Sequence, residues 1–128
     1  MRIIFKSRQI KGDGVGSAKV FPTINLKIPE QNFSLPNGVY AAFCTIAETK
    51  YKAALHFGPR PTFDKKINSL ELYILSEKLQ PYDTNQEIWV EAVERIRPIM
   101  TFGSPSDLKK QIGEDILKIN EILDKKPL

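Results

Sequence analysis

The fold is decided by two apolar segments, Gly38-Val39-Tyr40-Ala41-Ala42-Phe43 and Tyr51-Lys52-Ala53-Ala54-Leu55-His56-Phe57. Both are rich in aromatic and aliphatic residues over a length that is typical of a strand. The polar stretch Ala47-Glu48-Thr49-Lys50 lies between them and suits a hairpin turn. We therefore expect two neighbouring antiparallel strands in the middle of the chain.

Further segments with the composition of strands lie on both sides of this hairpin. They are residues 2–11, 23–28, 70–75 and 87–94. Turn-forming residues fill the connections, as in Leu35-Pro36-Asn37-Gly38 and Gly58-Pro59-Arg60-Pro61. Short strands without a helix between them predict an all-β antiparallel barrel or sandwich. No internal repeat or linker divides the chain, so we expect a single domain over residues 1–128.

One helix is expected near the C-terminus, over about residues 105–124. Ser104 can cap it, Pro105 fits its first position, and Asp107 completes a capping box with Ser104. An apolar stripe then predicts the face that packs on the barrel. The stripe consists of Leu108, Ile112, Ile116, Ile119 and Leu123, and is widened by Leu117 and Ile122. We expect residues 125–128 to be frayed.

The composition is that of an ordinary globular protein, with 41% hydrophobic and 27% charged residues among 128. No apolar run is long enough to span a bilayer, and no signal-peptide pattern is present, so no membrane partner is expected. Cys44 is the only cysteine, which excludes an intrachain disulfide and favours the reducing cytoplasm. We interpret Cys44 as a small buried hydrophobic residue, because no base or basic cluster adjoins it.

The net charge of +4 suits either nucleic acid or polyanionic phosphates. The lysines are scattered along the chain and form no basic run interleaved with aromatic residues, so we do not expect nucleic-acid binding. His56 is the only histidine, and no second cysteine or histidine could complete a zinc site with it. Any metal ion should therefore be held by oxygen atoms.

A glycine-rich run, Lys11-Gly12-Asp13-Gly14-Val15-Gly16-Ser17, precedes the segment Phe21-Pro22-Thr23-Ile24-Asn25. Glycine backbone can present several N–H groups to a phosphate without interference from side chains. Thr23 and Asn25 are two residues apart, so in a strand their oxygens point to one face. Neutral oxygens beside such a loop suit Mg²⁺ shared with nucleotide phosphates. The alternative is a turn followed by a strand with a polar face.

Several motifs together resemble the riboflavin kinase (flavokinase) family. The glycine run and Phe21–Leu26 look like the family's Gly-rich loop and Pro-Thr-Ala-Asn motif. The other matching segments are Leu35–Ala41, Phe57–Phe63, Leu70–Leu75, and Ile96-Arg97-Pro98 followed by Phe102, Ser104, Leu108, Gln111, Ile112 and Asp115. They occur in family order over residues 7 to about 124, which chance does not readily explain.

The resemblance implies a six-stranded antiparallel Greek-key barrel with a C-terminal helix, in agreement with the strand and helix pattern. It also implies transfer of the ATP γ-phosphate to the 5′-hydroxyl of riboflavin, which gives FMN. Mg²⁺ would be the cofactor, and riboflavin and ATP the small-molecule partners of a monomer. Many bacterial relatives carry an additional FMN adenylyltransferase domain, and we do not expect FAD synthesis from these 128 residues alone.

The resemblance also assigns roles to individual residues. Thr23 and Asn25 would hold Mg²⁺, and Glu71 would accept the proton of the riboflavin hydroxyl or orient that hydroxyl. Arg97 and Phe102 would contact the flavin. The ATP-binding residues would be Gly12, Gly14, Gly16, Ser17 and Thr23. The alternative for Glu71 is a solvated carboxylate on an outer face, and for Arg97 a surface residue that ends a strand before Pro98.

The chain departs from the family pattern around the glycine loop. Val20 stands where a glycine is usual, Ile24 replaces an alanine, and the loop is about one residue shorter. Tyr82-Asp83 stands in place of Tyr-Gly. These departures predict weaker binding of ATP than of riboflavin, relative to typical members. They leave open a non-catalytic flavin- or nucleotide-binding barrel, while a basic barrel for single-stranded nucleic acid is the third alternative.

Overall fold

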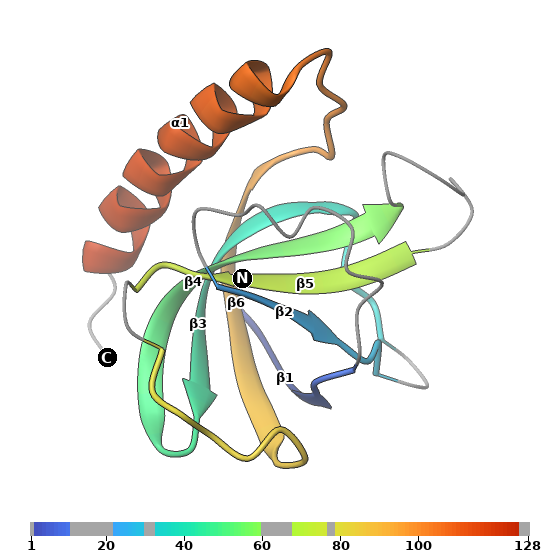
Figure 1. Cartoon of the computed structure of the whole chain (residues 1–128), viewed down its shortest axis with the longest axis vertical. Helices are drawn as coiled ribbons and strands as arrows, with labels where there is room; N and C mark the ends of the chain where they lie inside the picture. The colour runs from blue at the N-terminus through green and yellow to red at the C-terminus, as the bar shows by residue number, and fades with distance from the viewer. Residues whose placement is uncertain (1, 11–21, 30–32, 60–67, 77–78, 126–128) are drawn as a thin grey trace.

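The computed structural model describes residues 2–10, 22–29, 33–59, 68–76 and 79–125 (Figure 1). All the expected strands and the expected helix are present. The strands are β1 (Ile3–Arg8), β2 (Thr23–Leu26), β3 (Gly38–Ile46), β4 (Thr49–Pro59), β5 (Asn68–Ile74) and β6 (Glu87–Arg97), and the helix is α1 (Pro105–Asp124). The predicted segments thus fall on the observed strands, although β3, β4 and β6 extend further than the sequence pattern indicated.

The strands form one six-stranded sheet in the order β1-β6-β3-β4-β5-β2, and every neighbouring pair is antiparallel. The sub-order β6-β3-β4-β5 is a Greek key, because β6 returns to lie beside the first of three consecutive strands. The two end strands meet where Gln9 bridges to Leu26, with the Ile10 N–H donating to the Asn25 carbonyl at 2.8 Å. The sheet therefore closes into a barrel, and the Greek-key barrel expectation is confirmed.

The central hairpin turns more tightly than the sequence indicated. Ile46 pairs with Thr49, so only Ala47 and Glu48 form the turn between β3 and β4. Both residues have positive φ angles, 48° and 71°. Such angles at both positions define the type I′ turn, whose twist matches that of the flanking strands.

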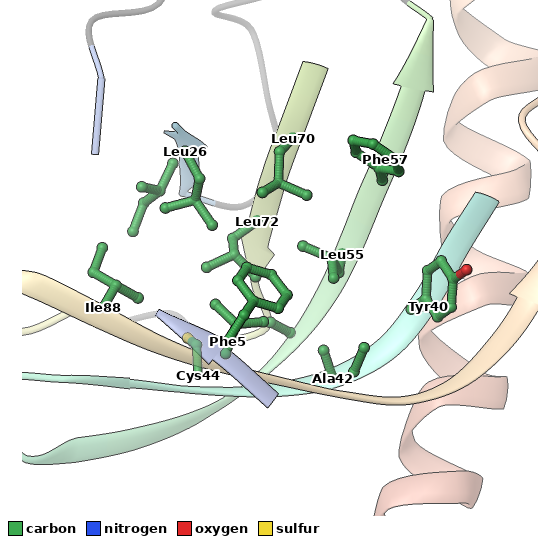
Figure 2. Packing of buried hydrophobic residues seen from close by; sticks show 14 of the residues in the cluster. Phe5, Leu26, Tyr40, Ala42, Cys44, Leu55, Phe57, Leu70, Leu72 and Ile88 are labelled. Atoms are coloured by element: carbon green, nitrogen blue, oxygen red, sulfur yellow. The ribbon is translucent and has the colours of Figure 1, made fainter. Parts of the chain in front are cut away.

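The interior of the barrel is filled by the inward-facing residues of the strands, and Figure 2 shows Leu55, Leu70 and Leu72 packed together there. These three leucines are essentially inaccessible to solvent. Cys44 lies in the same cluster and is 1% exposed. Burial raises the pKa of its thiol to about 12, so the thiolate is scarce at neutral pH. The interpretation of Cys44 as a buried hydrophobic residue is confirmed.

A second apolar cluster lies on the outer face of the sheet, beneath α1. It contains the outward-facing residues of β3, together with Ile119 and Leu123 of the helix. The buried residues of α1 are Asp115, Ile119 and Leu123, all in its C-terminal half, whereas Leu108 is 42% and Leu117 74% exposed. The expectation that these two leucines pack on the barrel is wrong. Leu108 lies in the N-terminal half of α1, where the helix runs off the sheet (Figure 1), whereas Leu117 lies between the buried residues Asp115 and Ile119 and points to the opposite side of the helix.

The ends of α1 follow the sequence signals. The Asp107 backbone N–H donates to the Ser104 hydroxyl oxygen at 3.2 Å, and Pro105 opens the first turn. At the other end, Lys125 donates its backbone N–H to the Ile122 carbonyl at 3.3 Å. Residues 126–128 of the expected frayed tail lie outside the described part of the chain. No helix of the described chain is both long and apolar enough to cross a lipid bilayer.

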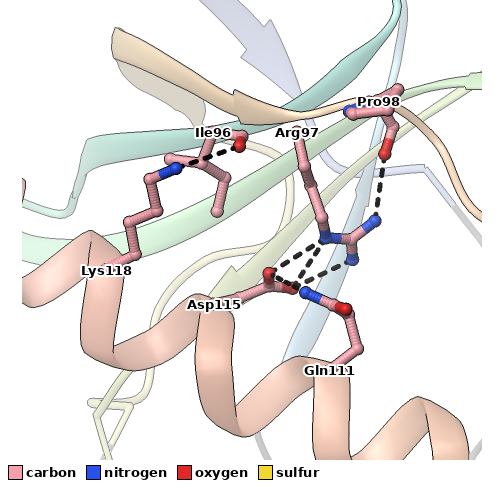
Figure 3. A network of polar contacts seen from close by, with 6 residues as sticks. All are labelled: Ile96, Arg97, Pro98, Gln111, Asp115 and Lys118. Atoms are coloured by element: carbon pink, nitrogen blue, oxygen red, sulfur yellow. Dashed lines mark hydrogen bonds and ion pairs between the residues drawn. The ribbon is translucent and has the colours of Figure 1, made fainter.

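An ion pair fixes α1 to the sheet (Figure 3). Arg97, the last residue of β6, donates from Nε and Nη2 to the Asp115 carboxylate at 2.9 Å. The two side chains are only 15% and 9% exposed. Gln111 donates to the same carboxylate at 3.0 Å. The bidentate geometry and the extra donor satisfy the buried charges, which makes this the main polar tie between helix and strand.

Asp115→Ala should lower the free energy of unfolding by about 3 kcal/mol, because it leaves the Arg97 guanidinium buried without its partner. Urea denaturation followed by circular dichroism measures this loss. Asp124→Ala is the matched control, since Asp124 on the same helix pairs with Lys52 of β4 but is 63% exposed. An exposed pair contributes about 0–1 kcal/mol. Equal losses in the two variants would show that the buried pair does not anchor the helix.

Candidate active site

The strand register brings the predicted catalytic and metal-binding residues to one patch on the outer face of the barrel. Glu71 of β5 lies opposite Asn25 of β2 and, on its other side, opposite His56 of β4. Tyr73 lies opposite Thr23. Residues directly opposite each other in an antiparallel sheet point to the same face, with neighbouring Cβ atoms. We call these five residues the site face.

The site face alternates with the core. Ile24 and Leu26 of β2, and Leu70 and Leu72 of β5, point into the barrel and are at most 2% exposed. The residues between them point outward and are half-buried. Their side chains are thus open to a ligand from outside while their backbone is held in the sheet.

A row of paired residues continues from the site face across the sheet to Arg97, which forms the ion pair with α1. His56 lies opposite Val39, and Val39 lies opposite Arg97. Val39 belongs to the apolar cluster that α1 covers. One cross-strand row therefore runs from Asn25 through Glu71 and ends at the arginine that ties the helix to the sheet.

Glu71 and Tyr73 interact directly on this face. Their spacing of two residues along β5 places both side chains outward, and the Tyr73 hydroxyl is hydrogen-bonded to the Glu71 carboxylate. Burial, assisted by the negative charge of Glu71, raises the pKa of Tyr73, while Arg97 acts weakly in the opposite direction. Tyr73 is thus protonated at neutral pH and serves as the donor. Glu71 is therefore half-buried and in contact with Tyr73 on the outer face, while its role as proton acceptor stays a prediction.

Thr23 and Asn25 fit a hard cation by the chemistry of their donor atoms. A hydroxyl and an amide oxygen lie on one face of β2, and both residues are half-buried. Oxygen ligands of this kind suit Mg²⁺, which retains several waters and phosphate oxygens in such sites. Within the described ranges, His, Cys, Asp and Glu residues form no group of three that could hold a metal ion.

The predicted flavin-binding residues lie at the far end of the row. Arg97 carries its guanidinium carbon 6.0 Å from the centre of the Phe102 ring. It also donates to the carbonyl of Pro98 at 3.1 Å. Its principal contact is Asp115, so part of its role is structural, and its contact with flavin stays a prediction. Gly12, Gly14, Gly16 and Ser17 of the predicted ATP loop, with Val20, lie outside the described residues.

Sequence reasoning missed three residues of this region. His56 and Tyr73 were not connected to Glu71, and Asp115 was not connected to Arg97. The spacing of Glu71 and Tyr73 alone could have suggested a shared face. The other two relations join separate elements, so only the strand register and the docking of α1 reveal them.

Comparison with known proteins gives consistent matches. The family model of flavokinase, described as riboflavin kinase, matches residues 1–123. A bifunctional riboflavin kinase/FMN adenylyltransferase of Buchnera aphidicola is 33% identical over 117 residues, covering 89% of this chain and 36% of that protein. The chain spans between 34% and 36% of the length of the first curated relatives it matches.

Solved structures share the fold. A macrolide-efflux protein of Streptococcus pneumoniae superposes with a TM-score of 0.72 at 25% identity, over 98% of this chain and 39% of that one. The riboflavin kinase of Trypanosoma brucei gives a TM-score of 0.68 at 18% identity, over 98% of this chain and 82% of that one. With the family model matching nearly the whole length, the chain belongs to the riboflavin kinase (flavokinase) family.

Proposed function

We propose that this chain transfers the γ-phosphoryl group of ATP to the 5′-hydroxyl of riboflavin, giving FMN and ADP. The observation that carries this proposal is the site face, where Glu71 stands opposite Asn25 and beside Tyr73. A carboxylate next to neutral oxygen ligands is what transfer from a nucleotide to an alcohol requires. The kinase reaction is the one that the family model over residues 1–123 supports.

The reaction needs an aligned alcohol, neutralised phosphate charge and an acceptor for one proton. The riboflavin 5′-oxygen forms a bond to the γ-phosphorus as the bond to the β–γ bridging oxygen breaks, and ADP leaves with that electron pair. Glu71 orients the hydroxyl and takes its proton. Thr23 and Asn25 would hold Mg²⁺, which when bound neutralises charge on the phosphate oxygens.

A non-catalytic flavin- or nucleotide-binding barrel is the second candidate. A protein that only binds has no need of a carboxylate held among polar neighbours on a face open to ligand. Incubation with riboflavin, ATP and Mg²⁺, followed by chromatography for FMN, separates the two candidates. Binding of both substrates without any FMN would favour the binder.

Single-stranded nucleic acid is the third candidate ligand, and one surface feature bears on it. A hollow of about 140 Å³ on the outer face is lined by Ile4, Phe43, Thr45, Lys50, Trp89, Val90 and Glu91. Trp89 is 48% exposed, with the Lys6 ammonium 5.3 Å from its ring centre. However, Lys6 lies 3.7 Å from Glu87, and Arg2 lies 2.9 Å from Glu91. These carboxylates compensate the basic charge that a phosphate backbone would need, so we expect no affinity in an oligonucleotide titration.

We further propose that the chain works as a monomer in the cytoplasm. The single buried cysteine suits a reducing compartment. Size-exclusion chromatography with light scattering tests the monomer.

Glu71→Gln should lower kcat by roughly two to four orders of magnitude, the usual contribution of a general base. The amide keeps the shape of the side chain but carries no charge and accepts no proton. Substrate affinities, measured by calorimetry, should change little because Glu71 acts on the reacting hydroxyl.

Glu94→Gln is the matched control for Glu71→Gln. Glu94 lies on β6 opposite Ala41, in the outward-facing row that also contains Tyr73, but it is exposed and outside the site face. It should retain normal turnover. Near-normal turnover of Glu71→Gln would remove Glu71 from the reaction. Glu77, which lies outside the described residues, Glu87 and Glu91 would become the next carboxylates to test.

Thr23→Val and Asn25→Ala should each raise the Mg²⁺ concentration needed for half-maximal activity, by roughly tenfold to a hundredfold. Each change removes one neutral oxygen ligand without placing a charge in the site. Thr45→Val is the control for Thr23→Val, because Thr45 is a half-buried strand threonine on the hollow beside Trp89. An unchanged Mg²⁺ dependence in both site variants would exclude Thr23 and Asn25 as cation ligands.

A further inference from the structure

Glu71 has polar neighbours on three sides of the site face. Asn25 stands opposite it on β2, His56 stands opposite it on β4, and Tyr73 stands two residues along its own strand. Each could influence how the carboxylate is oriented. The hydroxyl of Tyr73 is hydrogen-bonded to the carboxylate.

We propose that Tyr73 is a positioning residue for Glu71, whose hydroxyl holds the carboxylate in the orientation that receives the riboflavin hydroxyl. This inference rests on the proposed function, because it assumes that Glu71 is the proton acceptor. A glutamate on a strand rotates about three side-chain bonds, so a carboxylate without a partner samples many orientations. One directed hydrogen bond restricts that sampling while the carboxylate's other lone pairs stay available to substrate.

The environment of Tyr73 suits this role. The side chain is half-buried, and its neighbours across the sheet are Thr23 on β2 and Ala54 on β4. Ala54 is small and partly buried against the apolar cluster under α1, so the broad Tyr73 ring can lie over it. A ring with rigid geometry, attached to a strand inside the sheet, presents its hydroxyl at a fixed position. Pre-organisation of this kind is what a catalytic group needs from its supporting residues.

Tyr73→Phe tests the proposal, because it removes the hydroxyl and keeps the ring and its packing. We expect kcat to fall about tenfold, the usual contribution of a hydrogen bond to a charged group. The KM values for riboflavin and ATP should stay within about twofold, because the lost interaction acts on the reacting hydroxyl and not on binding. Thermal unfolding verifies that the variant is folded.

A double-mutant cycle with Glu71→Ala distinguishes positioning from a general structural effect. Alanine is used because the amide oxygen of glutamine could still accept the Tyr73 hydrogen bond. If Tyr73 acts through Glu71, Tyr73→Phe should not lower the residual kcat of Glu71→Ala any further. The same fold-loss in both backgrounds would overturn the proposal, as would a kcat of Tyr73→Phe equal to that of the unmodified chain.

Tyr51→Phe is the control for the loss of a structural hydroxyl. Tyr51 is buried inside the barrel, and its hydroxyl accepts the Gln80 backbone N–H at 3.1 Å. This variant should lose stability but keep its kcat.

The same variants distinguish a failure of the proposed function from a failure of the positioning role alone. Normal turnover of Glu71→Ala overturns the base assignment and this proposal with it. Loss of turnover in Glu71→Ala with an unaffected Tyr73→Phe overturns only the positioning role.

Discussion

The pairing register of β5 between β2 and β4 is the constraint on which the rest of the site depends. A slip of one residue would turn Glu71 into the barrel and Leu72 out to solvent. The register is held from inside, because Leu70, Leu72 and Ile74 are at most 1% exposed in the barrel core. Apolar burial thus fixes the position of the polar Glu71 side chain on the outer face. The same leucines that close the core place Glu71 beside Asn25.

The Arg97–Asp115 ion pair has a different physical character. Replacing a buried ion pair by apolar residues is often neutral for stability, whereas removing one partner is costly. The pair is therefore better understood as a device that sets where α1 docks. The apolar contacts of Ile119 and Leu123 hold the C-terminal half of the helix, and Asp115 fixes the point beyond which the helix leaves the sheet. The row that begins at Asn25 then ends beside a helix of defined position.

Much of the fold could be predicted from the sequence, because strand composition and capping signals are local. Ser104 and Pro105 located the start of α1, and the polar residues after Ile46 located the hairpin. The errors arise where the local sequence pattern does not determine which residues make tertiary contacts. Leu108 fits the helical stripe but is exposed because the helix extends beyond the sheet there, and Leu117 is exposed because it lies on the side of the helix opposite Ile119. The roles predicted for Glu71, Thr23 and Asn25 come from motifs and stay predictions, while the contact between Glu71 and Tyr73 could be recognised only from the structure.

The topology explains why distant parts of the sequence can serve one reaction. The segment that the family resemblance assigns to ATP leads into β2 at Thr23, and the segment that it assigns to flavin leaves β6 at Arg97. These two ends are far apart in the chain. Asn25 and Arg97 nevertheless lie in one cross-strand row, with Glu71 between them. A Greek key places the end of β6 next to β3 and the start of β2 next to β5. The two segments therefore meet the sheet in the same cross-strand row, with Thr23 and Asn25 next to the β5 strand that carries Glu71 and Arg97 at the other end.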